Sequence, residues 1–536
     1  MRHKWAVVKT FLAASLVAAS TAAADSSDLT PVPNANPKTV GFAVPNILSP
    51  ELAEIIVAQG SMRLENGSSL TNFYGYDNNG PMLPALGSNV EATKTEPDKN
   101  TYLVLKDQHG ADPNYDYGTH FLFQGHEGGQ GGKGYLTRIN LDADGAHHVT
   151  LFATTDKFGN SLPVFDGSTW DPWAQRLLFT AENGSNGGVW QATLDYPPTV
   201  EDISGVFGRA GYEGIQNDSQ GNLVIVEDTG GATGVGNSHA RQPNSFIYRF
   251  LPKDRRDLTK GGKLQALQVI SNRNPGQPIV FHPGAADADI LSLDVKDLHT
   301  YGIVFRTNWV TIHDTDVDGF APFNANALAK TKQATPFKRP ENGQFRPGTG
   351  FSEFFFDETG DTNALTEAGS DFGGFGSIMK LTSSPSSSSG QLTMFYKCDI
   401  DHSAFDNVAF WTQDKVVFVE DRGDTLHTQH NALDSAFLFD VTLDYANPSN
   451  QPIRILAEGR DASATIDSGL SGSSGFQNDG DNEITGIHVS DGDSTTGGIL
   501  GARNPNPFDD DWRVFYTQQH GDNNTWEIIP AEENEN

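Results

Sequence analysis

Cysteine and basic residues are scarce in this sequence of 536 residues. The single cysteine, Cys398, excludes a disulfide scaffold and a cysteine-based zinc cluster. Lys and Arg number 36 against 68 Asp and Glu, which gives a formal net charge of −32. Nucleic acids are held by clustered Lys and Arg, so we expect no nucleic acid partner, and an anionic membrane surface is equally disfavoured. The excess of carboxylates instead favours cations as ligands.

Long apolar runs are also missing, apart from one short run near the N-terminus. Three basic residues precede the run at 11–20, and the small residues 22–24 follow it. This is the pattern of a signal peptide, and the run is too short for a membrane-spanning helix, which needs about 20 residues. We expect residues 1–24 to be a cleaved Sec-type signal peptide and the protein to be secreted or periplasmic. The alternative is a buried N-terminal helix.

Helical periodicity is nearly absent from the remaining sequence, where residues 48–58 are the best helix candidate. Short runs rich in Val, Ile, Phe, Tyr and Thr recur instead, separated by Gly, Asn, Asp and Pro, and such runs indicate strands. Several of these strands end in a glutamate followed by glycine. The copies are FLFQGHEGG, LLFTAENG, LVIVEDTGG, EFFFDETGD and VVFVEDRGD, with Glu127, Glu182, Glu227, Glu358 and Glu420, and VFYTQQHGD with His520 is a degenerate sixth copy.

This repeat predicts an all-β fold, a β-propeller of about six blades with long inserted loops. The alternative is a set of β-sandwich domains. We divide the chain into the signal peptide at 1–24, an N-terminal extension with the start of the propeller at 25–100, and the propeller domain at 101–530. A propeller closes its own sheet edges, so we expect a monomer.

Equivalent strand ends of a propeller face one end of its channel, where the repeated glutamates would converge. Carboxylates packed together repel one another, and divalent cations relieve that repulsion. Oxygen ligands suit calcium best. We therefore predict calcium binding, with Glu127, Glu182, Glu227 and Glu420 among the ligands. His126 and His520 also lie at predicted blade tips.

Two further segments bear on ligands. Residues 314–319 read D-x-D-x-D-G, the start of a calcium loop, but Ala325 stands where an EF-hand needs a bidentate Glu. Either a looser calcium loop or a surface turn fits this segment. In Arg339-Pro340-Glu341 the Arg and Glu share one side of an extended segment, and the guanidinium fork suits a phosphate or carboxylate.

The order of the motifs resembles the PhoX-type alkaline phosphatases, a family of secreted β-propeller proteins. The resemblance covers roughly residues 100 to 525. Its segments include QGHEGG, TWDPWAQRLLFTAENGSNGGVW, YEGIQNDSQGNLVIVEDTGG, ATPFKRPE, FFFDETGD, FDNVAFWTQDKVVFVEDRG, EITGIHVSD and VFYTQQHG.

The resemblance implies hydrolysis of small-molecule phosphate monoesters at a calcium and iron cluster in the channel. Glu213 and Glu341 match metal-ligand glutamates of the family, and Arg339 matches the arginine that holds the substrate phosphate. Glu182 and Glu127 occupy the carboxylate positions of the early blades.

The sequence departs from the family pattern at the iron-binding cysteine. The family block ends in Cys-Glu-Glu, whereas residues 179–182 here read Phe-Thr-Ala-Glu. Cys398 lies far along the chain, and we expect it to be a buried structural residue. Loss of a soft ligand leaves calcium better supported than iron. Two other functions stay open, namely a non-catalytic calcium-stabilised binding module, and a calcium-dependent lactonase or esterase that would not require Arg339.

Overall fold

The computed structural model describes residues 29–39, 44–82, 92–235, 240–360, 371–459, 483–509, 511–519 and 523–532. The predicted signal peptide and His520 lie outside these residues.

Within the described part of the chain, the strands form five antiparallel sheets. One sheet contains β3 (Pro97–Val104), β4 (His120–His126), β5 (Leu136–Asn140) and β6 (Val149–Ala153). The next contains β7 (Ser168–Asp171), β8 (Arg176–Ala181), β9 (Gly188–Ala192) and β10 (Val200–Asp202). A nine-stranded sheet has, in spatial order, β11 (Tyr212–Asn217), β12 (Leu223–Glu227), β13 (Ile247–Pro252), β14 (Gly262–Ile270), β15 (Phe305–Asp314), β19 (Ser389–Lys397), β18 (Ser377–Thr382), β17 (Glu353–Glu358) and β16 (Gly343–Phe345).

The last two sheets each include a strand from the N-terminal segment. The first contains β20 (Phe405–Phe410), β21 (Lys415–Glu420), β22 (Ser435–Asp440), β23 (Ile453–Ala457) and β1 (Ile47–Leu48). The second contains β24 (Glu483–Ser490), β25 (Arg513–Gln519), β26 (Asn524–Pro530) and β2 (Leu52–Ala58). The described helices are short: α1 (Ser204–Phe207), α2 (Ala286–Ile290), α3 (Leu293–Leu298), α4 (Thr315–Asp318), α5 (Ala325–Thr331), α7 (Gly423–His430) and the 3₁₀ turns η2 (Gly184–Asn186) and η3 (Leu258–Lys260).

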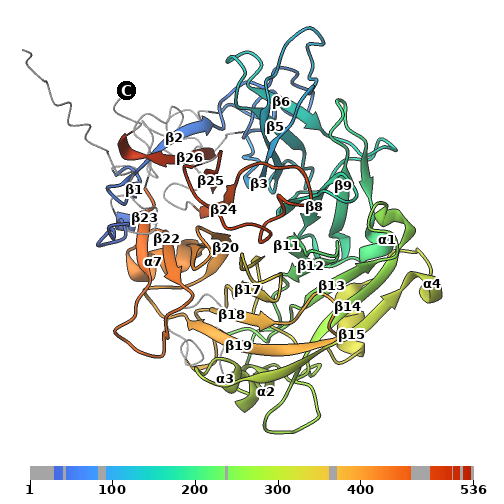
Figure 1. The fold of residues 1–536 in the computed structure, drawn as a ribbon, viewed down its shortest axis with the longest axis vertical. Coiled ribbons are helices and arrows are strands. Elements are labelled where there is room, and N and C mark those ends of the chain that lie inside the picture. Colours follow the sequence, from blue (N-terminus) through green and yellow to red (C-terminus); the bar gives the residue numbers. More distant parts are fainter. Residues whose placement is uncertain are drawn as a thin grey trace, which may run out of the picture.

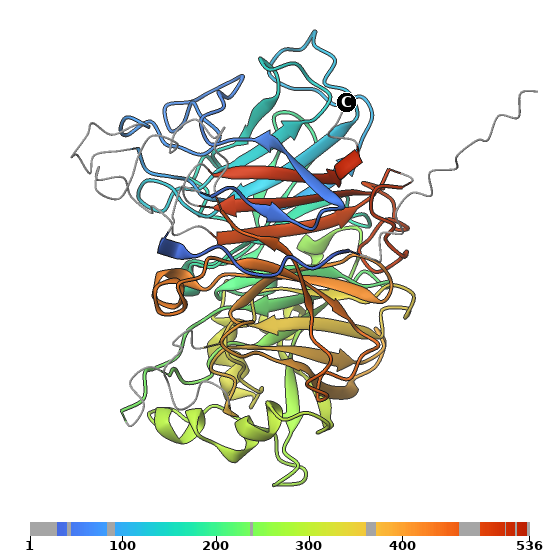
Figure 2. The same cartoon turned by 90° about the vertical axis from the view of Figure 1, so that its left-hand side faces the viewer.

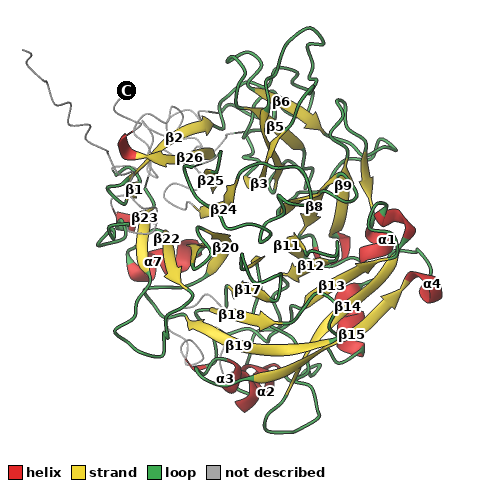
Figure 3. Cartoon of the chain, in the orientation of Figure 1, coloured by secondary structure: helices red, strands yellow, loops and turns green. Residues whose placement is uncertain are grey.

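The sheets are arranged around a central axis (Figures 1 and 3). Their inner strands contact one another in the order β3, β7, β11, β16, β20 and β24, and β24 contacts β3 again. These contacts close a ring of six strands in the described part of the chain. The predicted all-β propeller fold is therefore confirmed.

The nine-stranded sheet results from one long strand on the periphery. β15 pairs with β14 on one side and with β19 on the other, so it joins two sets of strands that each start at the axis. The described part of the chain therefore has five sheets but six inner strands. The difference arises because β15 pairs with β14 and with β19, and so merges two neighbouring sets of strands into one sheet.

Residues 48–58, the best helix candidate from the sequence, contain a strand instead. β2 pairs with β26 from Leu52 opposite Pro530 to Ala58 opposite Thr525. Figure 2 shows this N-terminal strand beside the C-terminal strands. The β-branched Ile55, Ile56 and Val57 favour a strand, and pairing with the chain's last strand, which local sequence does not reveal, completes the sheet.

Apolar side chains fill the spaces between neighbouring sheets. One cluster packs Phe355 and Ile378 of one strand set against Phe405 and Phe418 of the next. Burial of such apolar surface is the main favourable term in folding. Cys398 belongs to this cluster and is buried, as predicted for a structural cysteine.

Candidate metal and phosphate site

An acidic residue stands at or just before the start of each inner strand. The six residues, which we call the acid ring, are Asp98, Asp166, Glu213, Glu341, Asp406 and Glu483. Because the inner strands surround the axis, their starts bring these carboxyl groups toward the same end of the channel. Glu213 and Glu341 of this set were predicted from the sequence as metal ligands, whereas the other four were not.

Irregular strand pairing helps to aim these side chains. The ladder between β3 and β4 shifts register between Pro97 and Asn100, and Asp98 lies within the shift. Similar shifts surround Glu213 in β11 and Asp406 in β20. A β-bulge bends its strand and re-aims a side chain, and bulges are common beside active sites.

Neighbouring strand starts also approach each other closely. A Cβ atom at Gly167, which follows Asp166, would lie 2.3 Å from the carbonyl oxygen of Glu213. Only glycine permits this contact, so Gly167 allows the carboxyl groups of two adjacent strands to meet.

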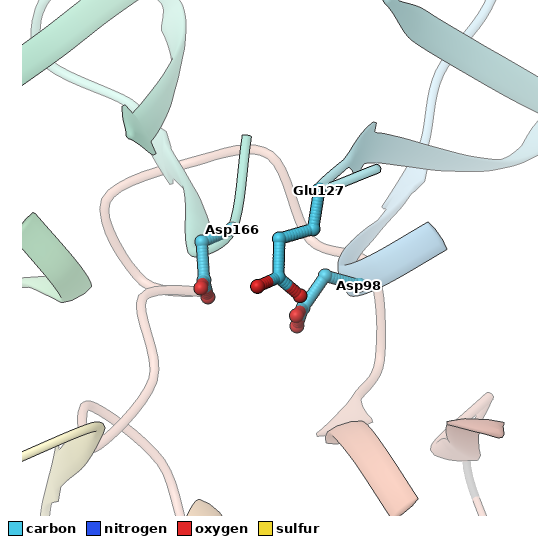
Figure 4. Close-up of side chains that lie close together, drawn as sticks. All are labelled: Asp98, Glu127 and Asp166. Carbon is cyan, nitrogen blue, oxygen red and sulfur yellow. The ribbon is translucent and has the colours of Figure 1, made fainter. Parts of the chain in front are cut away.

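Three groups of carboxylates have ligand atoms that lie within 4.8 Å of one another. They are Asp98–Glu127–Asp166, Asp166–Glu182–Glu213 and Glu213–Glu341–Asp406. In Figure 4 the side chains of the first group point toward one another from separate elements. Asp166 and Glu213 each belong to two groups, so the three groups form one continuous acidic site, which we call the channel site.

Burial in the channel disfavours ionised carboxylates. Burial first, and repulsion from neighbouring carboxylates second, raise the pKa values of Asp98, Glu182, Glu213, Glu341, Asp406 and Glu483 well above their ordinary range. Ligand oxygens of Asp166 and Glu213 lie within 4.8 Å of each other, and repulsion from Asp166 is one cause of the raised pKa of Glu213. A proton or a cation between two such buried carboxyl groups relieves this repulsion.

The donors of the channel site fit a hard divalent cation. Asp166 Oδ1 and Glu213 Oε2 are buried, and no described residue forms a hydrogen bond with either atom. All the ligand atoms of the three groups are carboxylate oxygens, the donors that calcium prefers. Cys398 belongs to an apolar cluster and to none of these groups. Calcium thus fits the donor set better than a metal that needs a thiolate.

Arg339 lies at the side of the channel site. Its Nε and Nη2 atoms donate to Asp228, at 3.0 and 2.7 Å, and Nη2 also lies 3.2 Å from Glu341. The Arg339 side chain is 27% exposed, whereas those of Asp228 and Glu341 are buried. Its φ of 55° lies in the left-handed region, and such strained residues cluster at functional sites.

Of the five strand-end glutamates expected to converge, the structure brings only Glu127 and Glu182 into the channel site. Glu227 instead accepts hydrogen bonds from Tyr248 Oη at 2.7 Å and Asn326 Nδ2 at 2.8 Å. Glu420 pairs with Arg422, and Glu358 pairs with His299 at 2.9 Å. The expectation is corrected accordingly, and metal binding by any of these residues stays a prediction.

A one-residue shift in the repeat explains this difference. Glu227 pairs with Tyr212 across its sheet, and His126 pairs with Pro97 in the equivalent place. Asp228, and not Glu227, therefore occupies the same structural position as Glu127. His126 likewise occupies the same structural position as Glu420. Successive strand residues point to opposite faces, so a shift of one residue sends the side chain to the other face. The doublets Glu227-Asp228 and Glu420-Asp421 carried this signal in the sequence.

His126, a predicted blade-tip residue, is buried between strands rather than at the channel. Its Nε2 lies 2.9 Å from Thr137 Oγ1, its ring stacks on Tyr135, and burial lowers its pKa to about 3. These contacts give His126 a packing role.

The D-x-D-x-D-G segment forms a capped turn. Asp314 accepts a hydrogen bond from Asp316 N at the start of α4, and Asp318 accepts one from Asp314 N. Lys253 and Lys263 pair with Asp316 and Asp314. Among the described residues, these carboxylates belong to no group that could hold a metal, which agrees with the surface-turn alternative.

Comparisons with known proteins give one family match. The sequence model of the alkaline phosphatase PhoX family matches residues 221–495, a stretch that contains Asp228, Arg339, Glu341 and Asp406. No curated protein matches the chain. Among solved structures, TolB from Acinetobacter baumannii is 9% identical with a TM-score of 0.29, and the match covers 80% of this chain and 63% of TolB. A protein classed with the gluconolactonases is 10% identical with a TM-score of 0.26, over 68% of this chain and 88% of that protein.

Proposed function

Because the chain belongs to the PhoX alkaline phosphatase family, we propose that it hydrolyses phosphate monoesters in a calcium-dependent reaction. The observation that carries the proposal is the position of Arg339. This partly exposed guanidinium lies beside the buried carboxylates of the channel site, within the stretch that matches the family. A cation-binding site next to a fixed phosphate-binding group is what phosphate ester hydrolysis requires.

The channel site would hold the metal ions through Asp98, Glu127, Asp166, Glu182, Glu213, Glu341 and Asp406. Bound metal ions polarise phosphoryl oxygens and neutralise charge on the leaving oxygen. Carboxylates from different strands would hold the ions in a fixed position, because each side chain is anchored in a different part of the rigid propeller.

Arg339 would bind the substrate phosphate. Asp228 takes up Nε and Nη2, which leaves the Nη1 hydrogens for phosphate oxygens. The paired carboxylate holds the guanidinium in one orientation before substrate arrives, and preorganised donors stabilise the charge that develops on the transferred phosphoryl group.

We also propose that the protein is secreted or periplasmic, that small phosphate esters are its substrates and that it acts as a monomer. Members of the PhoX family are typically secreted. No helix among the described residues is long and apolar enough to cross a membrane.

Hydrolysis of p-nitrophenyl phosphate, measured with and without EGTA beside elemental analysis of the purified protein, tests the proposal. We expect bound calcium and turnover that EGTA abolishes and added calcium restores. Calcium without turnover on phosphate esters would favour the non-catalytic module. Turnover only on lactones or carboxylic esters would favour the third function.

Adjacent isosteric substitutions at Glu227 and Asp228 test the one-residue correction. Asp228→Asn should lower kcat/KM for p-nitrophenyl phosphate about 10- to 100-fold, because a hydrogen bond between charged groups contributes about 1.5–3 kcal/mol. Glu227→Gln should leave kcat/KM within about twofold, since this side chain contacts Tyr248 and Asn326 and not Arg339. The opposite ranking of the two variants would refute the correction.

A further inference from the structure

A lysine crosses the buried side of the channel site. Lys99 lies in β3 and is 2% exposed, and its Nζ donates to Asn342 Oδ1 at 2.6 Å. Asn342 directly precedes β16. In the ring of inner strands β3 and β16 are three steps apart in either direction, so they face each other across the axis. The Lys99 side chain therefore spans the channel.

No other strand start supplies a cation at this level. The residues that follow the acid-ring members in the remaining strands are Gly167, Gly214, Asn342, Asn407 and Ile484. Among these six strand starts, all of which the structure describes, only that of β3 adds a positive charge, through Lys99. Asn342 and Asn407 are fully buried, whereas Glu127, Glu182 and Arg339 are partly exposed. Lys99 thus lies on the more buried side of the channel site, and Arg339 lies on the more exposed side.

The surroundings of Lys99 are strongly acidic. Burial lowers the pKa of Lys99, and the nearby carboxylates of Asp406, Asp98, Asp357 and Asp166 oppose that shift by attracting the ammonium group. Three of these belong to the channel site. Asp357 Oδ2 and Asn342 Nδ2, both buried nearby, form no hydrogen bond with any described residue. One ammonium group therefore serves several carboxylates and belongs to no single ion pair.

We propose that Lys99 is a built-in cation of the channel site, which fixes one positive charge on the axis beside the carboxylates that would hold the metal ions. The inference rests on the proposed metal dependence. Lys99 partly neutralises the acid ring without calcium, and it opposes calcium binding by like-charge repulsion. It also blocks the axis, so that metal ions and substrate enter from the side of Arg339.

Lys99→Met tests this role, because methionine is similar in length and uncharged. Calcium affinity is measured by titration of EGTA-treated, desalted full-length protein at constant ionic strength, together with the melting temperature in EGTA. We expect the variant to bind calcium about fivefold more tightly or better, and to melt at a lower temperature than wild type in EGTA. Lys99→Arg should behave as wild type. Lys415→Met, which removes a cation that pairs with Asp440, should leave calcium affinity unchanged.

The sign of the change separates this role from mere packing. Loss of a packing residue would loosen the acid ring and weaken calcium binding, whereas loss of a competing charge strengthens it. Unchanged or weaker affinity in folded Lys99→Met would overturn the inference and leave the proposed function standing. If Lys99→Met does not fold, Lys99→Gln gives the same comparison. A wild-type protein that binds no calcium would instead overturn the proposed function, and this inference with it.

Discussion

Replacing Arg339 with alanine should lower kcat/KM for p-nitrophenyl phosphate about 100- to 1,000-fold, because removal of one preorganised donor to a developing oxyanion costs that much in other enzymes. The guanidinium is held by Asp228 through Nε and Nη2, so the position that we propose for phosphate binding exists before substrate arrives. Alanine removes the donors and leaves the carboxylates of the channel site in place. Calcium content should therefore stay at or above the wild-type value, and the loss should appear in turnover.

Arg256→Ala is the matched control, since Arg256 is 81% exposed and pairs only with Asp254 in the described part of the chain. Its kcat/KM should equal that of wild type. Arg339→Lys separates charge from geometry. Lysine keeps the positive charge but lacks the planar fork, so we expect it to recover only a minor part of the activity. Wild-type turnover in folded Arg339→Ala would eliminate Arg339 as the phosphate-binding group.

Local sequence patterns sufficed for the fold class and for part of the channel site. Strand-like runs with repeated polar ends predicted a propeller, and the ring of inner strands confirms that fold. Glu213 and Glu341 were identified through the family resemblance, and both lie in the channel site. β2 was misread because its partner, β26, is separated from it by almost the whole chain.

The remaining part of the channel site depended on register. The sequence repeat places the glutamates at the ends of the second strands in equivalent positions. In the strand that ends at Glu227, however, the side chain that faces the channel is that of the next residue, Asp228. Asp98, Asp166 and Asp406 precede or begin first strands and share no motif beyond their acidity. They become equivalent only when the strand starts are superposed around the axis. Lys99 was missed for the same reason, since a lone lysine in a strand gives no sign that it reaches the opposite strand.

Removing calcium should have the largest effect on stability, and the effect should grow with pH. Burial raises the pKa values of the acid-ring carboxyl groups in the folded protein, whereas in the unfolded chain they return to about 4. At pH values between the unfolded-chain pKa of about 4 and the raised pKa values of the folded protein, the folded state holds protons that the unfolded chain has lost. The free energy of unfolding therefore falls as pH rises above about 4.

Calcium, bound as we propose, would take the place of those protons and should remove most of this dependence. In EGTA we expect the melting temperature to fall by about 3–5 °C between pH 5 and pH 8, a loss of a few kcal/mol for a chain of this size. With saturating calcium the fall should be less than half as large. Scanning calorimetry at both pH values, with and without calcium, measures the four temperatures. Glu341→Gln provides the matched comparison, because one fewer titrating group should make the fall in EGTA shallower. If the metal-free protein were equally stable at both pH values, the carboxyl groups of the channel would already be neutralised by another group, and Lys99 is the first residue to substitute.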